Sequence, residues 1–480
     1  MRSLSPAAAV AAAAVLTATG CAGTGSSGSS GLGAAASFAP ANAAAFVAVD
    51  TSLSSGQWRA ADGLLSRFPG RDALVTRLRQ AFERRSKLSW ADDVRPALGP
   101  ELDLVALRGQ PTQLVALTRP TDSGKLDALL AKAGGGIVSR HVGDWTAVSS
   151  SKRALDALAH VTAPLADAPA YREATAKLAG DALVRAYADG AQAQRLVAAL
   201  PGQVVATAPP ARSRVGGFGK HGRTFAAERY SWGAADLVAA DDGLRLEAFT
   251  RAAPPTPAAV EHTRVLLTRS ASYTPLLVDE IPAGPLLVAD YQAASGGFST
   301  ADASALPAWL RPLLARSPGL AEDIDSVLGG ETALYVQPGL PVPDVTLVTQ
   351  PADTAAAVSA LPQLLSELRT AFPLLGQLSL RHAVVGGQLV VSTSGRGIAD
   401  FRSAGPRLSA DPTFAEATKA AGLPQQTTGF VYANLKDALP LLRAAAPRSG
   451  LGDVGALRSL TAYGTRSGAD SSYTLFLEAR

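Results

Sequence analysis

The chain has 480 residues, of which 47% are apolar and 18% are charged, and its formal net charge is +4. This composition excludes a disordered chain, because enough apolar side chains are present to build hydrophobic cores. The small net charge gives no support for nucleic-acid binding, which requires a clustered basic face.

The first 20 residues have the layout of a bacterial lipoprotein signal peptide. Arg2 provides a basic start, an alanine-rich apolar stretch runs to Leu16, and small residues precede Cys21, the single cysteine of the chain. The apolar stretch is too short to span a bilayer, which takes about 20 residues. We therefore expect cleavage after residue 20, acylation of Cys21 (a palmitate-type anchor), and attachment to the extracytoplasmic face of the cell membrane. A buried cysteine and an unlipidated secreted form are the alternatives.

Residues 21–37 are rich in glycine and serine, which predicts a flexible tether. A coil of this composition and length reaches roughly 20–25 Å. The folded part is therefore expected to stand just off the membrane. A chain with one cysteine forms no internal disulfide, and it has no Cys/His cluster for structural zinc.

Residues 38–250 are expected to form a first α+β unit. Short runs rich in β-branched and aromatic residues alternate with helical patterns. A helix is predicted from Gln57 to Phe68, ended by Pro69-Gly70, and Asp122 and Ser150 are expected to open two others. The expected strands are Phe46–Asp50, Leu102–Leu107, Gln113–Thr118, Trp145–Ser149, Ala182–Ala188 and Leu244–Phe249.

A long segment of this unit, from Gly190 to Ala227, contains basic residues and no acidic residue. It is interpreted either as an ordinary solvated loop or as a contact with an anionic membrane, which attracts about 1 kcal/mol per basic residue. Its glycine-rich part lacks the spacing of a phosphate-binding loop. The residues proposed for membrane contact are Arg212, Arg214, Lys220 and Arg223.

Residues 251–280 are expected to be a proline-rich linker followed by a helix, and residues 281–480 a second α+β unit. The second unit repeats motifs of the first in the same order, which predicts an internal duplication. Asp353, the counterpart of Asp122, is expected to cap a helix. The repeated pairs are Val142–Ser150 with Val385–Thr393, Pro169–Thr175 with Pro412–Thr418, Thr118–Asp122 with Thr349–Asp353, Ala186–Asp189 with Val431–Asn434, Leu244–Ala248 with Leu475–Ala479, Trp232-Gly233 with Tyr463-Gly464, and, more weakly, Phe46–Asp50 with Leu286–Asp290.

Tight polar turns between successive strands predict antiparallel pairing. The expected fold is therefore α+β, with two tandem similar units, each an antiparallel sheet with helices packed on one face. Whether the two sheets merge is left open by the sequence.

The start of the first unit resembles a known family. Phe46–Asp50, Gln57-Trp58, Phe68-Pro69-Gly70 and Leu98–Glu101, together with the lipoprotein leader, resemble the actinobacterial lipoproteins grouped as the domain of unknown function 3352 family. The resemblance covers most of the mature chain and implies an envelope lipoprotein. The family carries no assigned activity or catalytic residues.

Four residues at repeated positions are candidate ligand or interface residues. Asp50 and Asp290 are expected at the ends of equivalent strands, either as a symmetric pair flanking a cleft between the units or as turn and cap residues. Tyr187 and Tyr432 recur in strands, where they either line a pocket or belong to the core.

The sequence contains no serine-nucleophile, nucleotide or metal motif, so no catalytic residue, metal ligand or cofactor is predicted. The favoured hypothesis is a non-enzymatic envelope lipoprotein that binds a lipid or another apolar ligand on a surface or in a cavity between two lobes. The alternative is a structural or scaffolding lipoprotein that docks on a membrane protein complex. A hydrolase is the third hypothesis and would need buried Ser, His and Asp residues that converge in space.

Overall fold

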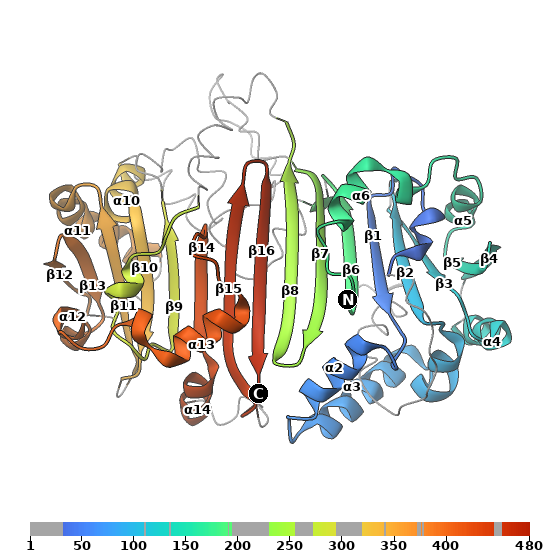
Figure 1. Ribbon diagram of the computed structural model, residues 1–480, viewed down its shortest axis with the longest axis horizontal. Helices are drawn as coiled ribbons and strands as arrows, with labels where there is room; N and C mark the ends of the chain where they lie inside the picture. Colours follow the sequence, from blue (N-terminus) through green and yellow to red (C-terminus); the bar gives the residue numbers. More distant parts are fainter. Residues whose placement is uncertain are drawn as a thin grey trace.

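The computed structural model describes residues 32–109, 112–133, 136–190, 192–193, 230–254, 272–293, 319–339, 342–371, 376, 379–445 and 454–480. The described strands form a single antiparallel sheet of 16 strands, so the two predicted sheets are one (Figure 1). The strands of the N-terminal half are β1 (Ala45–Asp50), β2 (Glu101–Leu107), β3 (Gln113–Thr118), β4 (Val138–Val142), β5 (Trp145–Ser149), β6 (Val184–Asp189), β7 (Tyr230–Ala240) and β8 (Gly243–Ala252). Those of the C-terminal half are β9 (Leu287–Gln292), β10 (Gly330–Gln337), β11 (Asp344–Pro351), β12 (Arg381–Val385), β13 (Gln388–Ser392), β14 (Gly429–Asn434), β15 (Leu457–Ser467) and β16 (Asp470–Ala479). The α+β class and the antiparallel pairing agree with the sequence prediction.

The two halves join edge to edge in the middle of the sheet, where β8 pairs with β16 (Figure 1). Going outward from β8 the order is β7, β6, β1, β2, β3, β5 and β4, and from β16 it is β15, β14, β9, β10, β11, β13 and β12. The two central hairpins, β7–β8 and β15–β16, each carry a bulge near their start, between Tyr230 and Trp232 and between Leu457 and Ser459. The short strands β4 and β12 are the two free edges of the sheet.

Helices pack on both faces of the sheet, so the expectation that they pack on one face is wrong. Because side chains alternate along a strand, Val390 faces the core beneath α12, while Leu389 and Val391 face the core beneath α10 and α11. We call these faces the α6/α13 face and the α2/α11 face. The first carries η1 (Ala34–Ser37), α5 (Lys152–Ala159), α6 (Pro169–Thr175), η7 (Leu277–Asp279), α12 (Gly395–Arg402) and α13 (Pro412–Ala421). The second carries α2 (Gly56–Leu65), α10 (Leu320–Leu328) and α11 (Thr354–Ala371).

The remaining α-helices are peripheral to these cores. They are α3 (Arg71–Ser86), α4 (Ser123–Ala133) and α14 (Leu435–Ala445). None of the helices in the described part of the chain is long and apolar enough to cross a membrane.

Local capping follows the sequence closely. Asp122 accepts from Lys125 N at the start of α4, and Asp353 accepts from Ala355 N and Ala356 N at the start of α11. The helix expected to open at Ser150 is instead capped by Ser151, whose hydroxyl accepts from Ala154 N. These side-chain acceptors satisfy backbone N–H groups that have no partner within the helix.

The predicted boundaries of the tether and the linker need correction. Ala35 and Ala36 of η1 are buried in the core of the N-terminal half, so the packed part of the chain begins before residue 38. Tyr273 pairs with Thr427, and Leu277 and Ile281 are buried in the core of the C-terminal half, so that half begins before residue 281. The helix expected within residues 251–280, around 265–267, lies outside the described residues.

Candidate functional site

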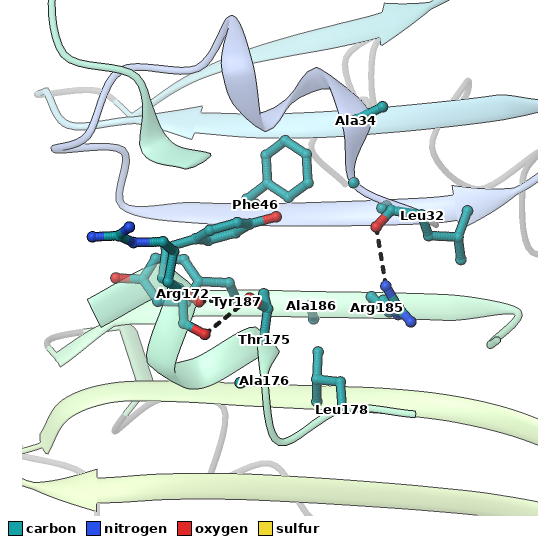
Figure 2. A pocket seen from close by; sticks show the side chains of 13 residues that line it. Leu32, Ala34, Phe46, Arg172, Thr175, Ala176, Leu178, Arg185, Ala186 and Tyr187 are labelled. Carbon is teal, nitrogen blue, oxygen red and sulfur yellow. Dashed lines mark hydrogen bonds between the residues drawn. The ribbon is translucent and has the colours of Figure 1, made fainter. Parts of the chain in front are cut away.

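A pocket opens on the α6/α13 face of the N-terminal half, and we call it the α6 pocket (Figure 2). Its volume is about 410 Å³, within the usual range of small-molecule pockets, roughly 300–1,000 Å³. It lies between residues 32–34, strands β1 and β6, and the segment from Tyr171 to Leu178, which includes most of α6.

One side of the α6 pocket is aromatic. The Tyr171 ring makes edge-to-face contacts with Phe46 at 5.9 Å and with Tyr187 at 5.2 Å between ring centroids. Burial raises the pKa of both tyrosine hydroxyls, which therefore stay neutral at physiological pH. Leu32 and Leu178 add apolar surface, so most of this lining favours an apolar group.

The opposite side carries a half-buried cation, Arg185 of β6 (Figure 2). Its Nη1 donates to Leu32 O at 3.2 Å, and its Nη2 donates to Ala179 O. The buried Nε has no hydrogen-bond partner, and within the described residues the hydrogen bonds of Arg185 go to backbone carbonyls. Arg185 thus brings a positive charge into the pocket that backbone carbonyls solvate without neutralising.

Two buried carboxyl groups hold the wall formed by residues 33–35. Glu101 Oε1 accepts from Gly33 N at 2.5 Å and from Ala34 N at 3.2 Å, and Asp103 Oδ2 accepts from Ala35 N at 3.2 Å. Burial, together with the nearby charge of Glu101, raises the pKa of Asp103 to about 9, so Asp103 keeps its proton at neutral pH. The wall is therefore tied to β2 by both side chains.

Close packing explains the glycine in this wall. Gly33 has φ 102°, and a Cβ at this position would lie 3.0 Å from the Tyr171 hydroxyl oxygen. A larger residue would strain the backbone and displace the ring that lines the α6 pocket.

In the corresponding region of the C-terminal half, buried side chains contact one another and the backbone. Glu331 Oε1 accepts from Leu276 N and Leu277 N at 2.7 Å, as Glu101 does at residues 33 and 34. The Tyr273 hydroxyl donates to Asp290 Oδ1, and burial raises the pKa of Asp290 to about 8. Phe414 packs edge to face on Tyr432 at 5.1 Å.

Asp50 and Asp290 do not form a symmetric pair at a cleft. Asp50 ends β1 opposite Glu101, whereas Asp290 lies inside β9, opposite Ala333. Six strands separate β1 from β9, because the halves join edge to edge instead of facing each other. Asp50 Oδ1 accepts from Ser52 N at 2.8 Å, which agrees with the turn interpretation, and burial raises its pKa to about 6.

Tyr187 and Tyr432 also do not meet, because four strands separate β6 from β14. Tyr187 lines the α6 pocket, and Tyr432 is buried in the core of the C-terminal half. The other predicted site residues, Cys21, Arg212, Arg214, Lys220 and Arg223, lie outside the described residues.

The sequence analysis missed Arg185, Phe46 and Tyr171 as site residues. One signal was present: in Val184-Arg-Ala-Tyr187, strand alternation places Arg185 on the same face as the buried Tyr187. A cation on a core-facing position is a common sign of a site. Leu32, whose carbonyl accepts from Arg185, lies 153 residues earlier in the chain, so this contact could not be inferred locally.

No group of three or more His, Cys, Asp or Glu side chains that could hold a metal occurs among the described residues. Comparison of the chain with protein-family models, curated proteins and solved structures found no match. The resemblance to the domain of unknown function 3352 lipoproteins therefore stays a prediction from the sequence.

Proposed function

We propose that this protein is a non-enzymatic binding protein of the cell envelope, lipid-anchored through Cys21, which holds a small, largely apolar molecule in the α6 pocket. The supporting observation is the pocket itself: about 410 Å³, lined by three aromatic rings and several aliphatic side chains together with two arginines and Thr175. Pockets of this size and lining are typical of small-molecule sites. The proposed binding site therefore lies within the N-terminal half and not in the cavity between two lobes that the sequence suggested.

We also propose that the two halves are copies of one unit. The matching strand order on the two sides of the β8–β16 pair supports this idea, as do the equivalent roles of Glu101 and Glu331. Ser151 and Ser394 cap helices at matching places, which adds to the support.

The proposed duplication requires a different alignment of the central hairpins. Ala240 pairs with Gly243 at the β7–β8 turn, and Ser467 pairs with Asp470 at the β15–β16 turn. Leu244 then corresponds to Ser471, not to Leu475. The shift is an even number of residues, so both alignments place the same side chains on each face.

A tryptophan placed at the mouth of the α6 pocket tests the binding function. Ala176 is exposed and lines the pocket, so Ala176→Trp should block entry without disturbing a core. Native mass spectrometry of the purified protein should show a bound small molecule that is lost in this variant. Ala131→Trp, on the exposed side of α4, is the matched control. An unliganded wild type that binds no apolar probe would contradict the proposal.

The scaffolding alternative has its own supporting observation. Leu441 and Leu442 of α14 are 43% and 54% exposed, which is unusual for adjacent leucines. Cross-linking from α14 to one specific membrane protein, together with an empty α6 pocket, would favour scaffolding over ligand binding.

A further inference from the structure

The charged side chains that line the α6 pocket are all basic. Its lining includes two cations, Arg172 and Arg185, and no acidic residue. Arg172 is exposed, whereas Arg185 is half-buried beside Leu32, on the side of the pocket away from the Phe46 and Tyr187 rings (Figure 2). A ligand that fills this space therefore meets aromatic surface at one end and a guanidinium group at the other.

Arg185 has N–H donors that the described residues do not use and a positive charge that no direct ion pair among them neutralises. Of its five N–H groups, which is the general inventory of a guanidinium, the hydrogen bonds to Leu32 O and Ala179 O use two. Asp236 lies directly opposite Arg185 on β7, but its Oδ2 accepts from Ala179 N at 2.6 Å. Burial raises the pKa of Asp236 and the charge of Arg185 lowers it, so Asp236 compensates the guanidinium charge only in part and forms no direct hydrogen bond to it. A poorly compensated cation in a pocket is stabilised when a ligand supplies the anion.

The sheet register explains why Arg185 stays open to the pocket. Ala48 of β1 lies directly opposite both Arg185 on β6 and Asp103 on β2. The methyl group of Ala48 is too small to cover the guanidinium group or to pair with it. Asp103, one strand further, is held by Ala35 N and keeps its proton at neutral pH.

The other half of the sheet has no such cation at the matching place. One row of directly opposite residues crosses the whole sheet through Arg185. Outward from β8 on the N-terminal side, this row passes through Asp236, Arg185 and Ala48. On the other side it passes through Tyr463, Phe430 and Asp290. An aromatic side chain thus stands where the N-terminal half has Arg185, and a carboxyl group stands where it has Ala48.

We propose that the ligand of the α6 pocket is a small amphipathic carboxylic acid, whose carboxylate binds Arg185 while its apolar body packs on Phe46, Tyr171 and Tyr187. This inference rests on the proposed binding function and adds the chemical class of the ligand. It makes Arg185 the residue that determines specificity, and it restricts the site to the N-terminal half.

Three straight-chain ten-carbon compounds with different head groups test the proposal: decanoate, decanol and decylamine. Calorimetric titration of wild-type protein at neutral pH should give a decanoate affinity about tenfold or more above that of decanol, from charge-assisted hydrogen bonds. Decylamine should bind more weakly than decanol. Ala176→Trp should weaken decanoate and decanol alike.

Substitution of the arginine separates the head-group contact from the apolar contact. Arg185→Gln should lower decanoate affinity to the level of decanol and leave decanol unchanged, and Arg185→Lys should give an intermediate value. Arg153→Gln removes the same charge at an exposed position of α5 outside the pocket and should change decanoate affinity less than about threefold. Thermal unfolding of each variant establishes that it is folded.

The outcomes separate the two proposals. Equal decanoate and decanol affinities, both weakened by Ala176→Trp, would overturn the carboxylic-acid inference and leave the binding function standing. Unchanged decanoate affinity in a folded Arg185→Gln variant would also overturn the carboxylic-acid inference and leave the binding function standing. Failure of all three compounds to bind wild-type protein would overturn both.

Discussion

Glu247 of β8 lies directly opposite Thr474 of β16, at the point where the two halves of the sheet meet. From this pair the order of strands is matched on both sides, ending at β4 and β12. The junction is reinforced on the α6/α13 face, where Arg251 of β8 forms ion pairs with Glu173 and Asp470. Backbone pairing along the whole of β8 therefore makes the protein one body instead of two lobes on a hinge.

Cleavage between the halves should leave them associated. A protease site inserted between residues 260 and 261 lies in the stretch that connects β8 to the C-terminal half. After cleavage, the fragments should co-elute in size-exclusion chromatography, because separation would expose β8 and β16 as two long unpaired edges. The same sample in urea should separate, and separation in native buffer would contradict the single-sheet architecture.

Stability should fall as pH rises from 5 to 8. Burial raises the pKa of Asp103 to about 9 and that of Asp290 to about 8, from the ordinary aspartate value of 3.8. The folded state therefore binds more protons than the unfolded state in this window, and stability present at low pH is lost as each folded pKa is approached. The slope is bounded by about 1.4 kcal/mol per pH unit for each group.

Urea unfolding at several pH values measures this slope. Asp103→Asn and Asp290→Asn should each flatten it. Asp470→Asn is the control, because Arg251 and Lys177 lower the pKa of Asp470 and move its titration below this window. Unchanged slopes in both Asn variants would show that these carboxyl groups ionise normally.

Arg245 should contribute to the junction between the halves. Its Nη1 and Nη2 donate to Ala421 O at 2.6 Å and to Ala420 O at 2.9 Å, and its guanidinium group lies 4.8 Å from the Phe476 ring centroid. The two carbonyls end α13 and have few other partners. Arg245→Met should lower the free energy of unfolding by about 1–3 kcal/mol. Arg59→Met, on the exposed side of α2, should change it by less than about 0.5 kcal/mol.

Cys21→Ala should release the protein from the membrane fraction. The proposed anchor would depend on acylation of the one cysteine in the chain, and a second acyl chain is what makes such anchoring stable. Cell fractionation with palmitate labelling measures both effects. Membrane association that persists without the label would contradict the predicted lipoprotein anchor.

The basic segment offers a separate test of membrane contact. Reversing the charge of Arg212, Arg214 and Arg223 to glutamate should weaken binding of the unlipidated protein to anionic vesicles, by about 1 kcal/mol or more for each residue. Binding to neutral vesicles should not change. Equal binding of variant and wild type to anionic vesicles would favour the solvated-loop interpretation.

Much of the local structure could be predicted from the sequence. The strands Gln113–Thr118 and Trp145–Ser149 have their predicted bounds, and Asp122 and Asp353 cap the helices that they were expected to cap. These features depend on residues within a few positions of one another, since alternation and capping are short-range effects. Acylation at Cys21 is likewise a prediction from a contiguous motif.

The functional site was decided by tertiary structure. Arg185 becomes a candidate ligand contact only because Ala48, more than a hundred residues earlier in the chain, pairs with it in this register. A slip of one residue would place another side chain on that face. The distribution of helices over both faces and the edge-to-edge joining of Glu247 with Thr474 depend on pairings between distant segments in the same way. The sequence by itself determined the short-range elements and the candidate anchor, whereas the sheet junction and the pocket exist only through long-range strand register.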